Sequence, residues 1–133
     1  MIDIIKRNAF YNYVATGSIS VAQQKTMATT PVQLIAANSS YVVPVLIIFN
    51  IQRISTQRGL TVYFSGKDII AEIILLGNDN GVYCLPIQNT FSVTGAGNIA
   101  KNQPLFINAD INDTGLTGSP LTYKIYYLLE PVI

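Results

Sequence analysis

The chain has 133 residues, which suits one domain with one hydrophobic core over residues 1–133, and its eight basic and seven acidic residues leave a net charge of +1. It contains no histidine and only one cysteine, which excludes Ser-His-Asp triads, Cys–His pairs, histidine-containing zinc sites and an internal disulfide. Hydrophobic residues make up 50% of the chain and charged residues only 11%, so we expect no nucleic-acid groove and a surface that largely faces other protein.

Residues 1–30 are patterned less regularly than the rest of the chain. We expect an irregular N-terminal arm that reaches a neighbouring subunit, or an irregular first strand, with a strand candidate at 18–23. The chain start lacks the layout of a signal peptide, because Asp3 precedes the basic pair Lys6 and Arg7 and the apolar stretch is short. We therefore expect synthesis in the cytosol and a solvated basic pair, the alternative being contact with a phosphate or an acidic neighbour.

The following stretches alternate apolar and polar residues with the period of a β-strand. The strand candidates are 31–36, 41–50 and 59–65. In the last of these, Leu60, Val62 and Phe64 share one face, and the residues between them share the other. The apolar run 41–51 is too short to cross a membrane and contains Pro44, so we expect no membrane insertion.

The segment KDIIAEIILLG, residues 67–77, is ambiguous between strand and helix. Its isoleucines fall at helical spacing, and Asp68 and Gly77 would serve as N-terminal and C-terminal caps. Isoleucine is a mediocre helix former, however, and a strand buried on both faces shows the same unbroken run. We favour a strand, with a helix as the alternative.

The second half of the chain repeats the strand pattern between turn signals. The strand candidates are 82–87, 89–94, 104–110 and 121–130. The sequence NDNG at 78–81 predicts a tight turn, because Asn and Gly tolerate positive φ. Cys84 lies in an apolar stretch and is predicted to be a buried, inert thiol. Short strands spaced by turns predict an antiparallel β-sandwich or barrel.

The stretch TGAGNIA resembles the glycine-rich turn that binds dinucleotides, with Gly95, Gly97 and Ala100 at matching positions. That turn requires a following helix, whose N-terminus holds the pyrophosphate. Here Pro104 follows closely and strand alternation resumes at 104–110. We therefore interpret the glycines as a loop between two antiparallel strands and expect no cofactor.

The stretch DINDTG resembles the beginning of a calcium-binding loop, with Asp110, Asn112 and Gly115 at the first, third and sixth positions. Leu121 occupies the twelfth position, where an EF-hand needs a glutamate, and flanking helices are not predicted. An EF-hand is therefore excluded. A looser cation site using Asp110 and Asp113 remains the alternative to an Asx-rich turn.

The remaining chemistry-bearing residues favour contacts over catalysis. Glu72 and Glu130 are not predicted to meet in a cleft, and Glu72 is expected to be an edge or interface residue. Seven of the eight tyrosines could form a sugar-stacking platform, but we favour protein–protein contacts for them. These are Tyr11, Tyr13, Tyr63, Tyr83, Tyr123, Tyr126 and Tyr127, of which Tyr126 is expected on the face opposite Tyr123 and Tyr127.

Residues 30–133 as a whole resemble the single jelly-roll capsid proteins of icosahedral viruses. The resemblance rests on YVVPVLIIFN (41–50), NTFSVTGAGNIAKNQPLFINAD (89–110) and LTYKIYYLLEPVI (121–133). It is closest to the vertex (penton) or minor capsid proteins of tailless bacteriophages. The resemblance implies a single jelly roll of about eight strands and a symmetric homo-oligomer in a protein shell, and it transfers no functional residues.

Together these observations predict a structural component of a virion that is not an enzyme. We expect no catalytic, cofactor-binding or metal-binding residues and no small-molecule substrate. The expected partners are copies of the same chain, as a pentamer or a trimer, and other capsid proteins. The alternative is a β-sandwich binding module or receptor-binding head that recognises glycans.

Overall fold

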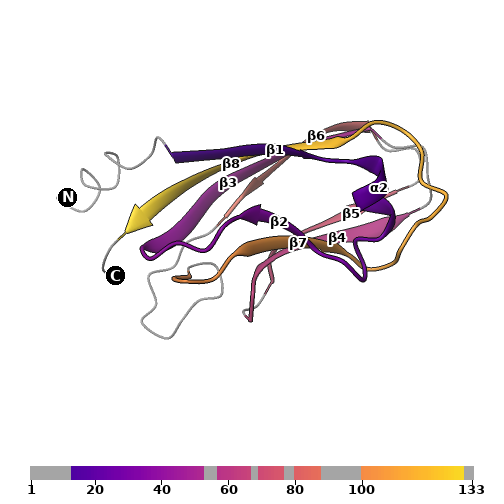
Figure 1. Cartoon of the computed structure of the whole chain (residues 1–133). Coiled ribbons are helices and arrows are strands. Elements are labelled where there is room, and N and C mark those ends of the chain that lie inside the picture. The colour runs from indigo at the N-terminus through magenta and orange to yellow at the C-terminus, as the bar shows by residue number, and fades with distance from the viewer. Residues whose placement is uncertain (1–12, 53–56, 67–68, 77–79, 88–99, 131–133) are drawn as a thin grey trace.

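A computed structural model describes residues 13–52, 57–66, 69–76, 80–87 and 100–130. In this part of the chain, eight strands form two four-stranded antiparallel sheets that lie face to face, with one short helix at one end (Figure 1). The predicted all-β sandwich is therefore confirmed. Lys6 and Arg7, the predicted strand 89–94 and the glycines of TGAGN lie outside the described residues.

Sheet A contains the strands in the order β1-β8-β3-β6. Their bounds are β1 Tyr13–Ile19, β8 Leu121–Glu130, β3 Tyr41–Gln52 and β6 Asn80–Pro86. The long apolar strand β3 is central and pairs with β8 on one side and β6 on the other. Its pairing with β8 shifts register between Pro44 and Leu46, which places the proline at a β-bulge.

Sheet B contains the strands in the order β2-β7-β4-β5. Their bounds are β2 Val32–Ile35, β7 Leu105–Ala109, β4 Arg58–Phe64 and β5 Ile69–Leu75. Strands β4 and β7 are central, and they pair so that Thr61 faces Asn108 and Tyr63 faces Phe106.

The strand pairing is that of a jelly roll. Strand β1 pairs with β8, β2 with β7, β3 with β6 and β4 with β5. The chain is therefore a long hairpin in which strands β1 to β4 form one arm, strands β5 to β8 form the other, and the turn lies between β4 and β5. This hairpin is wrapped so that β8 also pairs with β3, and β7 with β4. Wrapping closes the two sheets over one core, which is the eight-stranded arrangement of two Greek keys.

The core lies between the sheets and follows the period-two pattern of the sequence. Sheet A contributes the fully buried Ile47, Phe49 and Ile125, and sheet B contributes Leu60, Val62, Phe64, Leu105 and Ile107. The shared face predicted for Leu60, Val62 and Phe64 is therefore confirmed, and it is the face that meets the core. Their hydrophobic side chains stabilise the sandwich because burial removes apolar surface from water.

The helical alternative for residues 67–77 is wrong, because Ile69–Leu75 is strand β5. The strand is not buried on both faces, however. It is an edge strand of sheet B, with Ile73 and Leu75 in the core and Glu72 and Ile74 facing outward. The unbroken apolar run therefore reflects an exposed aliphatic surface as well as a core strand.

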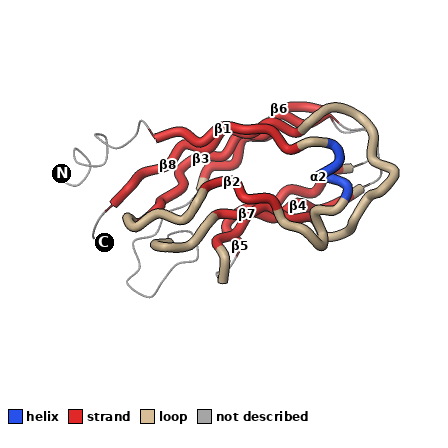
Figure 2. The backbone as a smooth tube through the Cα atoms, viewed as in Figure 1, coloured by secondary structure: helices blue, strands red, loops and turns tan. Residues whose placement is uncertain are grey.

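The strand predicted at 18–23 is also wrong in its second half. Strand β1 begins at Tyr13 and ends at Ile19, and residues Val21–Lys25 form helix α2, which lies at one end of the sandwich (Figure 2). Ser20 caps this helix, since its hydroxyl accepts from the Gln23 N–H and the Gln23 side chain accepts from the Ser20 N–H. This reciprocal cap favours helix over strand in a segment with otherwise weak preference.

Helix α2 is held against the sandwich by buried polar contacts. The Gln24 side chain donates to the Ile19 carbonyl at 3.0 Å. Arg58, at the start of β4, is almost fully buried and donates to the carbonyls of Gln24 at 2.9 Å and Ile111 at 3.0 Å. These contacts tie helix α2 to strands of both sheets, so residues 13–30 belong to this chain's own sandwich.

Candidate functional site

The lateral edges of the sandwich carry exposed aliphatic side chains. Strands β1 and β6 are the two edges of sheet A, and β5 is an edge of sheet B. Val14 on β1 is 41% exposed, Val82 on β6 is 62% exposed, and Leu76 just after β5 is 56% exposed. Because β1 contacts β2, the edge formed by β5 and β6 lies on the opposite side of the sandwich from β1.

Cys84 belongs to the exposed edge strand β6, so its predicted burial is wrong. Along β6 the half-buried Tyr83 and Leu85 pack against the core. The alternate residues Val82, Cys84 and Pro86 face outward. The stretch GVYCLPI is apolar on both faces although only one face meets the core. Sequence periodicity could not show which face of this stretch is exposed, because the outward residues are themselves apolar.

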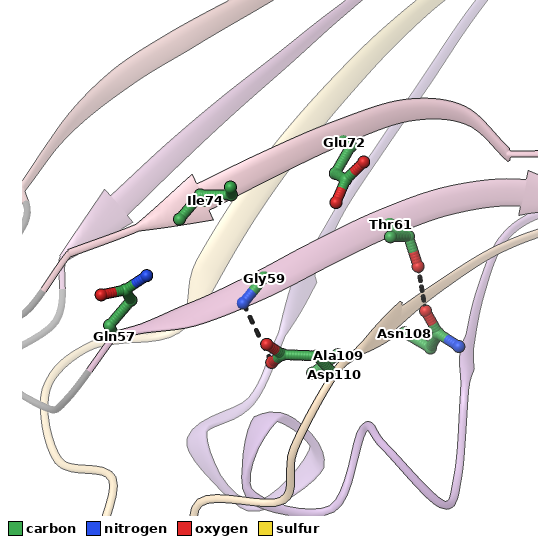
Figure 3. Close-up of a pocket in the computed structure, with 8 residues that line it drawn as sticks. All are labelled: Gln57, Gly59, Thr61, Glu72, Ile74, Asn108, Ala109 and Asp110. Atoms are coloured by element: carbon green, nitrogen blue, oxygen red, sulfur yellow. Dashed lines mark hydrogen bonds between the residues drawn. The ribbon is translucent and has the colours of Figure 1, made fainter.

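The outer face of sheet B is hollowed by a pocket of about 300 Å³ over strands β4, β5 and β7 (Figure 3). Its lining residues are Gln57, Gly59, Thr61, Glu72, Ile74, Asn108, Ala109 and Asp110. Gly59 and Thr61 occupy outward positions of β4, Glu72 and Ile74 those of β5, and Asn108 one of β7. Strand alternation therefore brings together polar residues from three separate stretches of the chain.

Hydrogen bonds orient two sides of this pocket. The Asp110 carboxylate accepts from the Gly59 N–H at 2.9 Å, and the Asp110 N–H donates to the Gly59 carbonyl at 3.0 Å. The Thr61 hydroxyl donates to the side-chain carbonyl of Asn108. In Figure 3 the Glu72 carboxylate extends from β5 towards β4, on the side of the pocket opposite Asp110.

An aromatic pair continues the pocket along the same face. Tyr63 and Phe106 lie two residues beyond Thr61 and Asn108 on the paired strands β4 and β7, and their ring centroids are 6.0 Å apart. Burial raises the pKa of the Tyr63 phenol above its ordinary value. The hydroxyl of Tyr63 therefore stays protonated and can donate a hydrogen bond at neutral pH.

Tyr11 lies outside the described residues, and the described tyrosines do not form one platform. Tyr123 and Tyr127 face the interior on β8, and Tyr126 lies on the opposite face of that strand, as predicted. The Tyr127 ring contacts Tyr13, whereas Tyr63 lies on the outer face of the other sheet. Two aromatic clusters on different sheets replace the single platform considered from the sequence.

The loop after β7 is held by hydrogen bonds to distant segments, namely the chain around the end of helix α2 and the start of β4. Asn112 accepts from the Ala28 N–H at 2.9 Å, and the Asp113 N–H donates to the Lys25 carbonyl at 2.9 Å. Asp110 is joined to Gly59, as described above. Across the described ranges, no group of three or more His, Cys, Asp or Glu side chains is placed to hold a metal ion.

Glu72 is an exposed residue of the edge strand β5, as predicted, but its pocket neighbours Gln57, Thr61 and Asn108 were not predicted to meet it. Their only sequence signal is that they are polar and, for Thr61 and Asn108, that they occupy outward positions of predicted strands. Which outward positions meet depends on strand order, and alternation does not specify strand order.

The sequence matches no protein-family model, and no characterised protein has a significantly similar sequence. No helix in the described part of the chain is long and apolar enough to cross a membrane. The described residues define an eight-stranded, all-β jelly-roll sandwich with apolar edges and an outer-face pocket whose lining mixes polar and apolar residues.

Proposed function

We propose that this protein is a structural subunit of a virus particle, a vertex (penton) or minor capsid protein that assembles through subunit–subunit contacts and performs no catalysis. The observation that carries the proposal is the exposure of aliphatic side chains at both lateral edges of a jelly roll. Jelly rolls of eight strands are recurrent in viral capsids. Low total charge favours the same function, because weakly charged flanks are easily buried against other protein.

The positions of the exposed side chains favour a closed ring. Val14 lies on one edge of sheet A and Val82 on the other. Contact between these different edges of neighbouring copies is heterologous, and heterologous contacts close into rings when the rotation between copies permits. A pentamer, or alternatively a trimer, would bury an apolar edge on every copy, with further capsid proteins as outer partners.

The first test is the native mass of the purified chain by light scattering after size exclusion, over a dilution series. A pentamer supports a vertex protein, and a trimer supports a decoration or spike-base role. A monomer at every concentration would contradict assembly of this chain with itself.

Two edge variants test the heterologous contact. Val14→Lys and Val82→Lys each place a charge on one edge and leave the other intact, so each variant alone is expected to be monomeric. Mixed in equal amounts, they are expected to form a dimer, because one intact β1 edge and one intact β6 edge then meet. Thr122→Lys, on the exposed outer face of the central strand β8, is the matched control and should retain the native mass.

The mixture distinguishes the contact types. If one edge variant keeps an even-numbered assembly by itself while the other is monomeric, the contact is isologous and the ring model is wrong. If both variants keep the native mass, these edges do not form the subunit contact.

A further inference from the structure

We infer that the outer-face pocket of sheet B, together with the Tyr63–Phe106 pair, is a binding site for a neutral oligosaccharide. The site is a property of one subunit and is independent of the assembly proposed above. It lies on sheet B, whereas the edge residues Val14 and Val82 belong to sheet A.

The charges of the described lining residues disfavour an anionic ligand. Among these residues, Glu72 and Asp110 are the ionisable ones, and both are carboxylates. No described lysine or arginine lines the pocket to neutralise a phosphate, a sulfate or an acidic sugar. A ligand rich in hydrogen-bond donors without negative charge fits this lining.

The unused hydrogen-bonding capacity of the pocket matches a polyol. One oxygen of Asp110 accepts from Gly59, which leaves the other oxygen for a ligand hydroxyl. The Thr61 hydroxyl donates to the Asn108 carbonyl oxygen, so the threonine oxygen remains an acceptor and the Asn108 amino group remains a donor. These donors and acceptors alternate along the paired strands β4 and β7.

The outer rim of the pocket adds groups that have no partner among the described residues. Glu72 and Gln57 are both exposed, and their side chains make no hydrogen bond to another described residue. The carboxylate supplies further acceptor positions, and the amide supplies a donor and an acceptor. A sugar hydroxyl is both a donor and an acceptor, so neighbouring hydroxyls can bind the Glu72 carboxylate and the Gln57 amide together.

The apolar surface beside the polar groups suits the C–H face of a sugar ring. Ile74 lies in the pocket, and the Tyr63 and Phe106 rings follow on the same face. From Gly59 to Tyr63 the strand rises about 13 Å. That strip is longer than one sugar ring, so the site favours a short oligosaccharide that spans the pocket and the aromatic pair.

The test begins with the fluorescently labelled full chain on an array of neutral and acidic oligosaccharides, with spermine and a lysine-rich peptide spotted beside them. Binding to neutral oligosaccharides is expected. Binding only to the two polycations would assign the carboxylates to amine recognition and overturn the inference, as would preference for acidic sugars or no binding at all.

The oligosaccharide bound most strongly is then titrated by calorimetry into three variants. Glu72→Ala and Gln57→Ala remove exposed groups from the pocket, and Gln52→Ala removes an exposed glutamine from sheet A as the matched control. We expect Glu72→Ala to weaken binding at least about tenfold, as loss of a hydrogen bond to a charged group does, with a smaller loss for Gln57→Ala. Unchanged affinity in both pocket variants would place the sugar elsewhere and overturn the assignment.

Tyr63→Ala tests the aromatic part of the site. Its expected effect is weaker binding of longer oligosaccharides and little change for a single sugar unit. Near-ultraviolet circular dichroism and the native mass of each variant separate loss of this site from loss of folding or of assembly. Equal weakening for both ligand lengths would exclude the aromatic pair as an extended subsite.

Discussion

Gly17 faces Tyr123 across the β1–β8 pair, and the tyrosine ring occupies the space where a side chain at position 17 would lie. A Cβ atom added to Gly17 would be 2.5 Å from the Tyr123 hydroxyl oxygen and 2.7 Å from the ring carbon that carries it. That hydroxyl donates to the Leu34 carbonyl at 3.5 Å, across the gap between sheets. One glycine therefore lets an aromatic side chain of sheet A reach sheet B.

Gly17→Ala is expected to lower the free energy of unfolding by about 1–3 kcal/mol, because the ring must move out of its packed position. Urea denaturation measures this loss. Ser18→Ala, at the neighbouring exposed position, is the control and should change stability little. In the double variant Gly17→Ala with Tyr123→Leu, the loss of unfolding free energy should be smaller than the sum of the losses in the two single variants. Strict additivity would show that the clash with Tyr123 is not the cause.

At the scale of single elements, helix α2 shows how a few side chains decide local structure. Its five residues, Val21–Lys25, are too few for an independently stable helix. The Ser20–Gln23 capping box satisfies the first backbone donors, and Gln24 and Arg58 fix the helix against the sandwich. The spacing of Ser20 and Gln23 is that of a capping box, which indicates the start of a helix. In this segment it is a better guide to local structure than the apparent alternation of 18–23.

Ser20→Ala is expected to cost about 1 kcal/mol of stability, seen as a lower urea midpoint with an unchanged slope. Ser20→Asp keeps an oxygen that can accept from the Gln23 N–H, so it should retain most of the stability. Equal destabilisation by both substitutions would contradict a capping role for Ser20.

At the scale of the whole molecule, strand order predicts a gradient of protection from hydrogen exchange. Within the described residues, strands β3 and β8 pair on both sides in sheet A, whereas β1 and β6 each pair on one side. Amides of Ile47, Phe49 and Ile125 are expected to exchange slowest, because their opening requires global unfolding.

This gradient is best measured in a monomeric edge variant, where no neighbour protects β1 or β6. There the outward-facing positions of the edge strands should exchange many times faster than β3 and β8. If β6 is as protected as β3 in the monomer, the sheet has no free edge there, and the proposed subunit contact loses its basis.

The sequence by itself determined which residues share a face in the strands that alternate strictly. Strict alternation at Leu60, Val62 and Phe64, and at Leu105 and Ile107, requires one buried face whatever the strand order. It also determined the all-β class and excluded histidine-based chemistry. These properties depend on local spacing or composition, so they can be determined before the chain is folded.

Only the tertiary structure decided strand order, edges and the pocket. Cys84 and Ile74 are exposed and lie on the edge strands β6 and β5. The sequence around an apolar residue does not show whether its face of the sheet is covered or exposed to solvent. Thr61, Glu72 and Asn108 meet because wrapping places β7, β4 and β5 side by side. Pairing of this kind joins distant segments, and local periodicity contains no information about which segments pair.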